Sequence, residues 1–310
     1  MNGSSAHSFN VSFADIQKAF LPPVFGVEFV LAFLGNSLAI WMFLCRDKPW
    51  HTGIVYAFSL AVNDLLYVIT LPLLILYYSN GKDWVFGEAI CKIERFLFTC
   101  NLYGSTFLIT CISLNRYLGI VHPMFAHNHL QAKHAWFTSL AVWVLASAIT
   151  SPAFVFSEVK VLRNRSECLG TASDEMLSHY FPYSLFLAAL GCAVPFTVTL
   201  GSYLSIFRAV HNSQSLKSSE KRRVALLVCV VVVLYAVSFI PYNILRNTNL
   251  YRRLHSLDKK PSSIYTAYQV SKGLVTLNMC IHPLLYATLL DNVRGLCVNC
   301  TWRKVTTLQS

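Results

Sequence analysis

Seven long stretches with almost no charge decide what this chain can fold into. A helix needs about 20 apolar residues to cross a bilayer, and each stretch is long enough. Charged residues make up 13% of the 310-residue chain, and its mean hydropathy is +0.50. We therefore predict an all-α membrane protein, one bundle of seven transmembrane helices. The stretches are residues 20–45, 53–78, 96–115, 135–156, 180–207, 224–245 and 264–290.

The segments between these stretches are too short to fold as separate domains. We expect an N-terminal segment at 1–19, a seven-transmembrane domain at 20–290 and a tail at 291–310. Residues 1–19 lack the apolar segment behind a basic start that marks a cleaved signal peptide. The first span is therefore expected to act as its own insertion signal.

Basic residues and glycosylation sequons together predict the orientation. Lys and Arg number 25 against 14 Asp and Glu, but no basic run is long enough to indicate a nucleic-acid partner. The loops and tail on one side of the predicted bundle are richer in basic residues, which is typical of the cytoplasmic side. Three sequons, at Asn2, Asn10 and Asn164, fall on the other side, where glycosylation takes place. We expect a plasma-membrane protein with its N-terminus outside and its C-terminus in the cytoplasm.

Four of the ten cysteines lie outside the apolar stretches. Cys91 and Cys168 face an oxidising compartment, where they either bridge a loop to the bundle or remain two free thiols. Cys297 and Cys300 follow the last span in a short segment that suits a helix on the membrane surface, with palmitoylation as an anchor to membrane lipids. Metal binding by this CxxC pair is the weaker alternative.

The chain carries none of the sequence signatures of a hydrolase, metalloprotease or nucleotide-hydrolysing enzyme that were sought. The motifs HExxH, GxSxG and GxxxxGK[ST] do not occur. Histidines between the third and fourth spans have no metal-site spacing and are expected in a solvated loop. We expect no catalysis, no bound metal and no cofactor.

Three cations lie near the predicted outer ends of the spans. Arg95 begins the third span, Arg246 ends the sixth and Lys272 lies about two turns inside the seventh. A cation there needs a partner or an aqueous cavity. Salt bridges to Glu94, Glu167, Asp174 or Glu175 would satisfy Arg95, and snorkelling would satisfy Arg246. If all three face one cavity, their shared ligand would be a multivalent anion.

Aromatic and polar side chains accompany these cations. Tyr268 lies four residues before Lys272, on the same helical face. The rings would either stack on a ligand or simply pack between helices. The accompanying residues are Phe98, Thr99, Tyr103, Tyr242, Asn243, Tyr268 and Gln269.

A set of residues in family order resembles the rhodopsin-like G-protein-coupled receptors over nearly the whole chain. Within that family, residues 95–123 and the YQVSKGL segment at 268–274 are similar to the purinergic nucleotide receptors, and most similar to the ATP-preferring subtype that couples to phospholipase C and adenylyl cyclase. The motif residues are Gly35, Asn36, Leu60, Ala61, Asp64, Asn115, Arg116, Tyr117, Trp143, Pro195, Phe239, Pro241, Pro283 and Tyr286.

The resemblance implies a receptor for an extracellular nucleotide. It implies that Arg95, Arg246 and Lys272 bind the phosphates and that Cys91 and Cys168 are bridged. G proteins of the Gq class, with Gs as a second class, and arrestin and receptor kinases are the implied partners. The nucleotide would line up against Phe98, Thr99, Tyr103, Tyr242, Asn243, Tyr268 and Gln269.

The chain departs from the purinergic pattern at several positions. Residues 1–19 and 246–267 hold no cysteine for the family's second disulfide. Asn243 replaces a common histidine, and Lys272 replaces a common arginine, which loses a bidentate contact. His282 stands before Pro283 where Asn or Asp is usual.

Two consequences follow for ligands of the family. The histidine is expected to weaken the sodium site that the resemblance implies at Asp64, Ser105 and Asn278. An opsin is excluded because the retinal lysine would fall at Thr276.

The expected mechanism couples a ligand at one end of the bundle to a G protein at the other. Pro241 and Pro283 would act as hinges, and a cleft would open beside Arg116, between Asn115 and Tyr117. Phe239, His282 and Tyr286 belong to the same switch. A receptor for small dicarboxylates or acidic lipids is the main rival, whereas a transporter would need repeated broken helices and a channel a filter.

Overall fold

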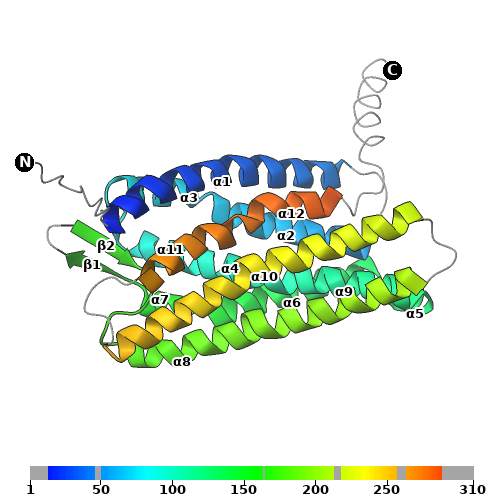
Figure 1. The fold of residues 1–310 in the computed structure, drawn as a ribbon. Coiled ribbons are helices and arrows are strands. Elements are labelled where there is room, and N and C mark those ends of the chain that lie inside the picture. Colours follow the sequence, from blue (N-terminus) through cyan, green and yellow to red (C-terminus); the bar gives the residue numbers. More distant parts are fainter. Residues whose placement is uncertain (1–12, 46–49, 163–164, 213–217, 257–262, 288–310) are drawn as a thin grey trace, which may run out of the picture.

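The computed structural model describes residues 13–45, 50–162, 165–212, 218–256 and 263–287. Within them the long helices run side by side and confirm the predicted seven-helix bundle (Figure 1). The elements are α1 (Phe13–Leu44), α2 (Thr52–Val68), α3 (Leu71–Ser79), α4 (Gly87–Val121), α5 (Pro123–His129), α6 (Ala132–Thr150), α7 (Ala153–Phe156), β1 (Glu158–Leu162), β2 (Arg165–Leu169), α8 (Leu177–Ala188), η1 (Ala189–Ala193), α9 (Val194–Asn212), α10 (Ser218–Leu254), α11 (Ser263–Thr276) and α12 (Asn278–Ala287).

Six helical runs are each long and apolar enough to cross a membrane by themselves. The seventh span is divided at Leu277 into α11 and α12, of 14 and 10 residues, and neither reaches that length alone. The second and fourth spans are also divided, at Ile69–Thr70 and at Ser151–Pro152. Hydropathy reveals the spans but not these breaks, because a break within an apolar stretch changes no charge.

Two helices are longer than their apolar stretches. The third span was predicted at 96–115, but α4 covers Gly87–Val121, and the sixth was predicted at 224–245, but α10 covers Ser218–Leu254. Their added turns carry charges such as Glu88 and Arg253. Charged residues are good helix formers outside the hydrocarbon, so a hydropathy limit underestimates the helix.

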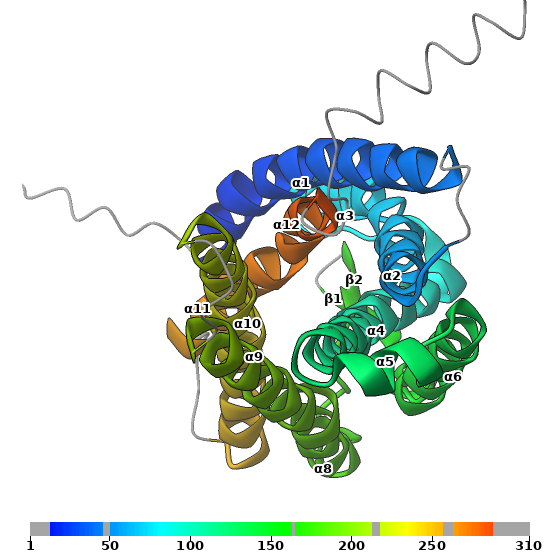
Figure 2. The ribbon, with the colours of Figure 1, turned by 90° about the vertical axis from the view of Figure 1, so that its right-hand side faces the viewer.

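The helices form a ring, and α4 lies inside it (Figure 2). It contacts α2, α6 and α9. The outer surface is apolar, with Val27, Leu31, Leu140 and Val237 each about half exposed or more, as expected of side chains that face lipid. Polar groups such as Asp64 are buried inside.

A β-hairpin closes one end of the bundle, here named the hairpin end. The sequence analysis did not predict it. Strands β1 and β2 pair antiparallel, and Val159 lies opposite Cys168. The bridge implied between Cys91 and Cys168 is confirmed as a disulfide that ties β2 to the first turn of α4. Ser166 donates its backbone N–H to the Asp83 carboxylate over 2.9 Å, so the hairpin is also held by the turn before α4.

The fifth span contains one wide turn, the π-helix η1, between α8 and α9. A wide turn leaves carbonyl groups without their usual partners. Thr106 donates to the carbonyl of Gly191 over 2.8 Å, and Tyr235 donates to that of Cys192 over 3.1 Å. Neighbouring helices α4 and α10 therefore satisfy the backbone at this turn.

Several predicted features lie outside the described residues. They are the sequons at Asn2, Asn10 and Asn164, the cysteines Cys297 and Cys300, and the membrane-surface helix after the last span.

Candidate functional site

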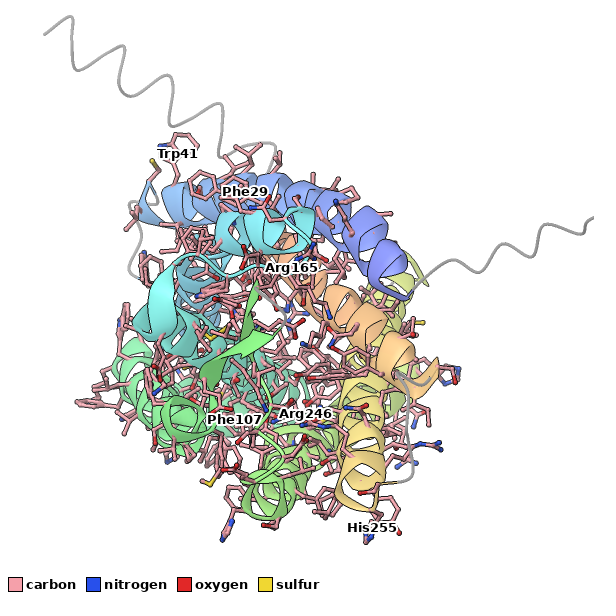
Figure 3. All side chains as sticks on the ribbon, turned by 90° about the vertical axis from the view of Figure 1, so that its left-hand side faces the viewer. Phe29, Trp41, Phe107, Arg165, Arg246 and His255 are labelled. Carbon is pink, nitrogen blue, oxygen red and sulfur yellow. A yellow bond between two sulfur atoms is a disulfide. The ribbon has the colours of Figure 1, made fainter. Side chains whose placement is uncertain are left out.

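Arg246 of α10 points into the ring of helices at the hairpin end (Figure 3). It donates to the Tyr180 hydroxyl of α8 over 2.7 Å and to the Tyr103 hydroxyl of α4 over 3.3 Å. Its Nε has no hydrogen-bond partner, and only 4% of the residue is exposed. The described residues contain no acid paired with it, and its burial excludes the snorkelling alternative.

Arg95 of α4 has an acid beside it. Its Nε lies 3.2 Å from the Glu94 carboxylate, close enough for an ion pair but without hydrogen-bond geometry. Its Nη2 donates to the Cys168 carbonyl over 3.2 Å. A Cβ atom added at Gly170 would lie 2.9 Å from the Arg95 side chain, so the glycine lets the segment after β2 cover this arginine. The salt-bridge interpretation with Glu94 therefore holds for Arg95.

Lys272 of α11 lies with its Nζ 4.9 Å from the centre of the Tyr268 ring, a cation–π contact that agrees with their predicted common face. Within the described residues Nζ forms no ion pair. Its charge interacts with those of Arg95, Arg246 and Glu94. The three predicted cations thus lie within electrostatic reach of one another, and one acid serves them.

A chain of aromatic contacts joins the helices that carry the cations. The Phe98 ring of α4 lies 5.9 Å from the Tyr242 ring of α10, which lies 5.8 Å from the Tyr268 ring of α11. Tyr67 of α2 extends the chain, 5.6 Å from Phe98. All of these centroid distances are within the range of aromatic pairs. The predicted aromatic residues are therefore in mutual contact.

The predicted polar residues differ in their freedom to bind a ligand. Thr99 donates to the Arg95 carbonyl over 2.7 Å, as a residue one helical turn on. Asn243 donates to the Phe239 carbonyl and accepts from Tyr103 over 3.4 Å. Gln269 is buried, and its Oε1 accepts no hydrogen bond.

The implied sodium residues surround Asp64 in the middle of the bundle. Ser105 and Asn101 reach one Asp64 oxygen, over 3.4 and 3.1 Å. His282 Nδ1 lies 2.7 Å from the other oxygen, and Asn278 donates to the Val275 carbonyl. The histidine occupies the position that a sodium ion would need beside the carboxylate, so these residues fit the ion poorly.

The switch residues lie towards the opposite end. Asn115 accepts a hydrogen bond from Thr52 of α2 over 2.7 Å, and Tyr286 donates to Asn36 of α1 over 3.5 Å. The remaining switch residues are placed as follows: Arg116 interacts with Tyr203, Tyr117 bonds His122, Phe239 packs on Tyr235, Pro241 lies within α10, and Pro283 packs on Gly35.

Sequence reasoning missed several residues of this region. Tyr180 stands at the start of an apolar stretch, where nothing marks it as the partner of Arg246. Arg253 was considered part of a solvated basic run, but it forms an ion pair with Asp174 over 2.7 Å and so joins α10 to the segment after β2. Asp174 had been considered a partner for Arg95. Only the fold brings these residues together.

Comparison with known proteins assigns the chain to a family. Residues 35–286 match the 7 transmembrane receptor (rhodopsin family). The chain is 45% identical to the Y-type purinoceptor 11 of Homo sapiens, over 92% of this chain and 83% of that protein. It is 40% identical to the Y-type purinoceptor 1 of Homo sapiens, over 94% and 79%, and 39% identical to that of Gallus gallus, over 94% and 82%. The chain therefore belongs to the rhodopsin family of seven-transmembrane receptors and, within it, to the Y-type purinoceptors.

Proposed function

We propose that this protein is a plasma-membrane receptor activated by an extracellular ATP-like nucleotide, with its hairpin end outside the cell and its C-terminus in the cytoplasm. The observation that carries the proposal is Arg246, a buried cation held by two tyrosine hydroxyls and by no acid of the described residues. A buried charge without a counter-charge is costly, and a polyphosphate would supply one.

The ligand would bind between α4, α10 and α11. Arg246 and Lys272 would contact the phosphates, and the rings of Phe98, Tyr242 and Tyr268 would border the base. Arg95 is already paired with Glu94 and is covered by the segment after β2. Its part would be weaker, adding positive field rather than an open donor.

Binding would favour a state in which the hairpin ends of α4, α10 and α11 lie closer together. A ligand that binds this state better raises its population. Pro241 and Pro283 each remove one helical hydrogen bond and would serve as hinges. At the opposite end α10 would swing outwards and admit a G protein beside Arg116.

The proposed partners are heterotrimeric G proteins of the Gq class, with Gs as a second class. Residues 208–223 would contribute to that contact. Arrestin and receptor kinases would end the signal, and palmitoylated Cys297 and Cys300 would hold the tail at membrane lipids. The output is nucleotide exchange on the partner, without chemistry in this chain.

A dose–response experiment in transfected cells tests the proposal. ATP, ADP and UTP are compared with succinate and 2-oxoglutarate, and both calcium and cyclic AMP are measured. We expect ATP to be the most potent. Arg246→Glu and Lys272→Glu should each lower ATP potency about 100-fold or more, since a hydrogen bond to a charged group contributes about 1.5–3 kcal/mol and reversal adds repulsion. Surface labelling checks that each variant reaches the membrane.

Lys92→Glu is the matched control. Lys92 lies on α4 near Arg95, but it is partly exposed and paired with Glu88 over 2.7 Å. Its reversal should leave ATP potency within a few-fold of the parent. A response to succinate or 2-oxoglutarate in place of nucleotides would favour the dicarboxylate alternative, and unchanged ATP potency in both pocket variants would refute the assignment of the site.

A further inference from the structure

A second cavity lies away from the cations, between α1 and α11. Its volume is about 430 Å³, within the range of about 300–1,000 Å³ that ligand sites occupy. Phe20, Val24 and Val27 of α1 line one side, and Val270 and Leu274 of α11 line the other. Val27 is 58% exposed on the outer surface of the bundle. The cavity is therefore open towards lipid.

Its wall contains one charged residue, Glu28. Glu28 is 1% exposed, and its Oε2 accepts a hydrogen bond from Thr276 over 2.7 Å. Its Oε1 accepts none, and no cation among the described residues pairs with the carboxylate. A buried carboxylate with one oxygen unpartnered is costly. Nothing in the proposed nucleotide site uses it.

The depth of Glu28 limits what could reach it. It stands ten residues after Lys18, where the first span begins, and that distance is about 15 Å along a helix. Since the hydrocarbon core is about 30 Å thick, the carboxylate lies near mid-depth. A ligand must therefore enter from the bilayer and carry its polar group at the end of an apolar body.

We propose that this cavity binds a lipophilic primary amine dissolved in the membrane, with its amino group on Glu28 and its hydrocarbon body between α1 and α11. An ammonium group supplies both the missing donor and the missing counter-charge, whereas a hydroxyl supplies only the donor. Thr276 ends α11 directly before the break at Leu277, so the amine would sit against the division of the seventh span.

Photo-crosslinking of the full-length receptor in lipid nanodiscs tests this site. The probe is a long-chain primary alkylamine carrying a diazirine, and an alcohol of the same chain serves for comparison. Mass spectrometry locates the label. We expect the amine to label residues 20–28 and 270–277 and the alcohol to label them several-fold less. Equal labelling by both would overturn the assignment to an amine, and amine label elsewhere would overturn the site.

Three variants make the test specific. Glu28→Gln keeps the shape of the side chain and an acceptor for Thr276, and it should lower amine labelling about tenfold, as expected for loss of one charged hydrogen bond. Val27→Trp keeps Glu28 but narrows the cavity, and it should also lower labelling. Leu31→Gln places an amide on the lipid side of α1 outside the cavity and should change nothing. Unchanged labelling in Glu28→Gln or Val27→Trp would refute the proposal.

Discussion

The guanidinium of Arg246 donates a hydrogen bond to the hydroxyl of Tyr180 over 2.7 Å, and this bond joins α10 to α8 at the hairpin end. The Arg246 carbon also lies 5.5 Å from the centre of the Tyr180 ring. The phenol thus lies beside the cation, in the place that a phosphate would take. A nucleotide would therefore exchange with a tyrosine hydroxyl, which is a weaker acceptor than a phosphate.

Tyr180→Phe is expected to destabilise the ligand-free receptor more than the ATP-bound one. Loss of the hydroxyl leaves a buried donor unsatisfied, which costs about 1–3 kcal/mol, and a phosphate would restore the partner. Thermal unfolding with and without ATP should show a larger ligand-induced rise in Tm than in the parent. Tyr183→Phe, which removes a bond to the Ile149 carbonyl, should lower both values equally. An unchanged ATP-induced rise in Tyr180→Phe would contradict the exchange.

Glu94→Gln is expected to raise ATP potency about tenfold. Glu94 is the acid beside Arg95 and also interacts with Lys272, so a ligand's phosphates compete with it. Removal of one charge in a buried site changes binding by an amount comparable to a charged hydrogen bond, about 1.5–3 kcal/mol. Calcium dose–response curves measure the change. Glu88→Gln, an exposed change on the same helix, should have no effect, and a fall in potency for Glu94→Gln would show that the acid helps the ligand.

Gly191→Ala is expected to destabilise the receptor by about 1–3 kcal/mol, the usual cost of overpacking. An added Cβ would lie 2.1 Å from Tyr103 Cδ1, so the ring must move, and Tyr103 also contacts Arg246. Tm and ATP potency should both fall. At Gly201, on α9, an added Cβ meets nothing within 4 Å. Gly201→Ala should therefore be neutral, and equal Tm values for the two variants would refute this packing argument.

His282→Asn is expected to make the receptor sensitive to sodium. The change frees the Asp64 oxygen that His282 now contacts over 2.7 Å. Sodium chloride should then lower agonist affinity several-fold in the variant and have little effect on the parent. Choline chloride at the same ionic strength corrects for screening of the phosphates. A sodium effect of equal size in the parent would show that the histidine does not exclude the ion.

Asn115→Asp is expected to lower signalling without agonist. In the parent the residue before Arg116 carries no charge and accepts a bond from Thr52. A carboxylate there would keep that bond and also attract the arginine, which stabilises the resting state. Basal inositol phosphate and cyclic AMP report the change, normalised to surface expression. Basal output equal to that of the parent would rule out this effect.

Much of the fold could be predicted because the membrane imposes one rule on every span. Charge-free length alone located all seven helices. The β-hairpin escaped prediction because β1 and β2 are short and pair with each other rather than with an apolar partner. The break at Leu277 and the wide turn at Ala189–Ala193 escaped because they leave the hydropathy unchanged.

The site could be predicted only as a set of candidates. Lys272 and Tyr268 were correctly placed on one face because both lie on one helix. The different states of Arg95 and Arg246 could not be predicted, because Glu94 and Tyr180 reach them only after α4, α8 and α10 have packed. A residue such as Tyr180 carries no local signal of this role.

The wide turn of η1 has a consequence far from the ligand. It holds one residue more than an ordinary turn, so every later side chain of α9 is rotated by about 100° relative to an unbroken helix. Tyr203 and Ile206 face inwards in this register, and Arg208 faces outwards. Without the extra residue, the neighbours of Tyr203 and Ile206 would turn inwards instead. A single inserted position near the nucleotide thus sets the sidedness of the surface that a cytoplasmic partner meets.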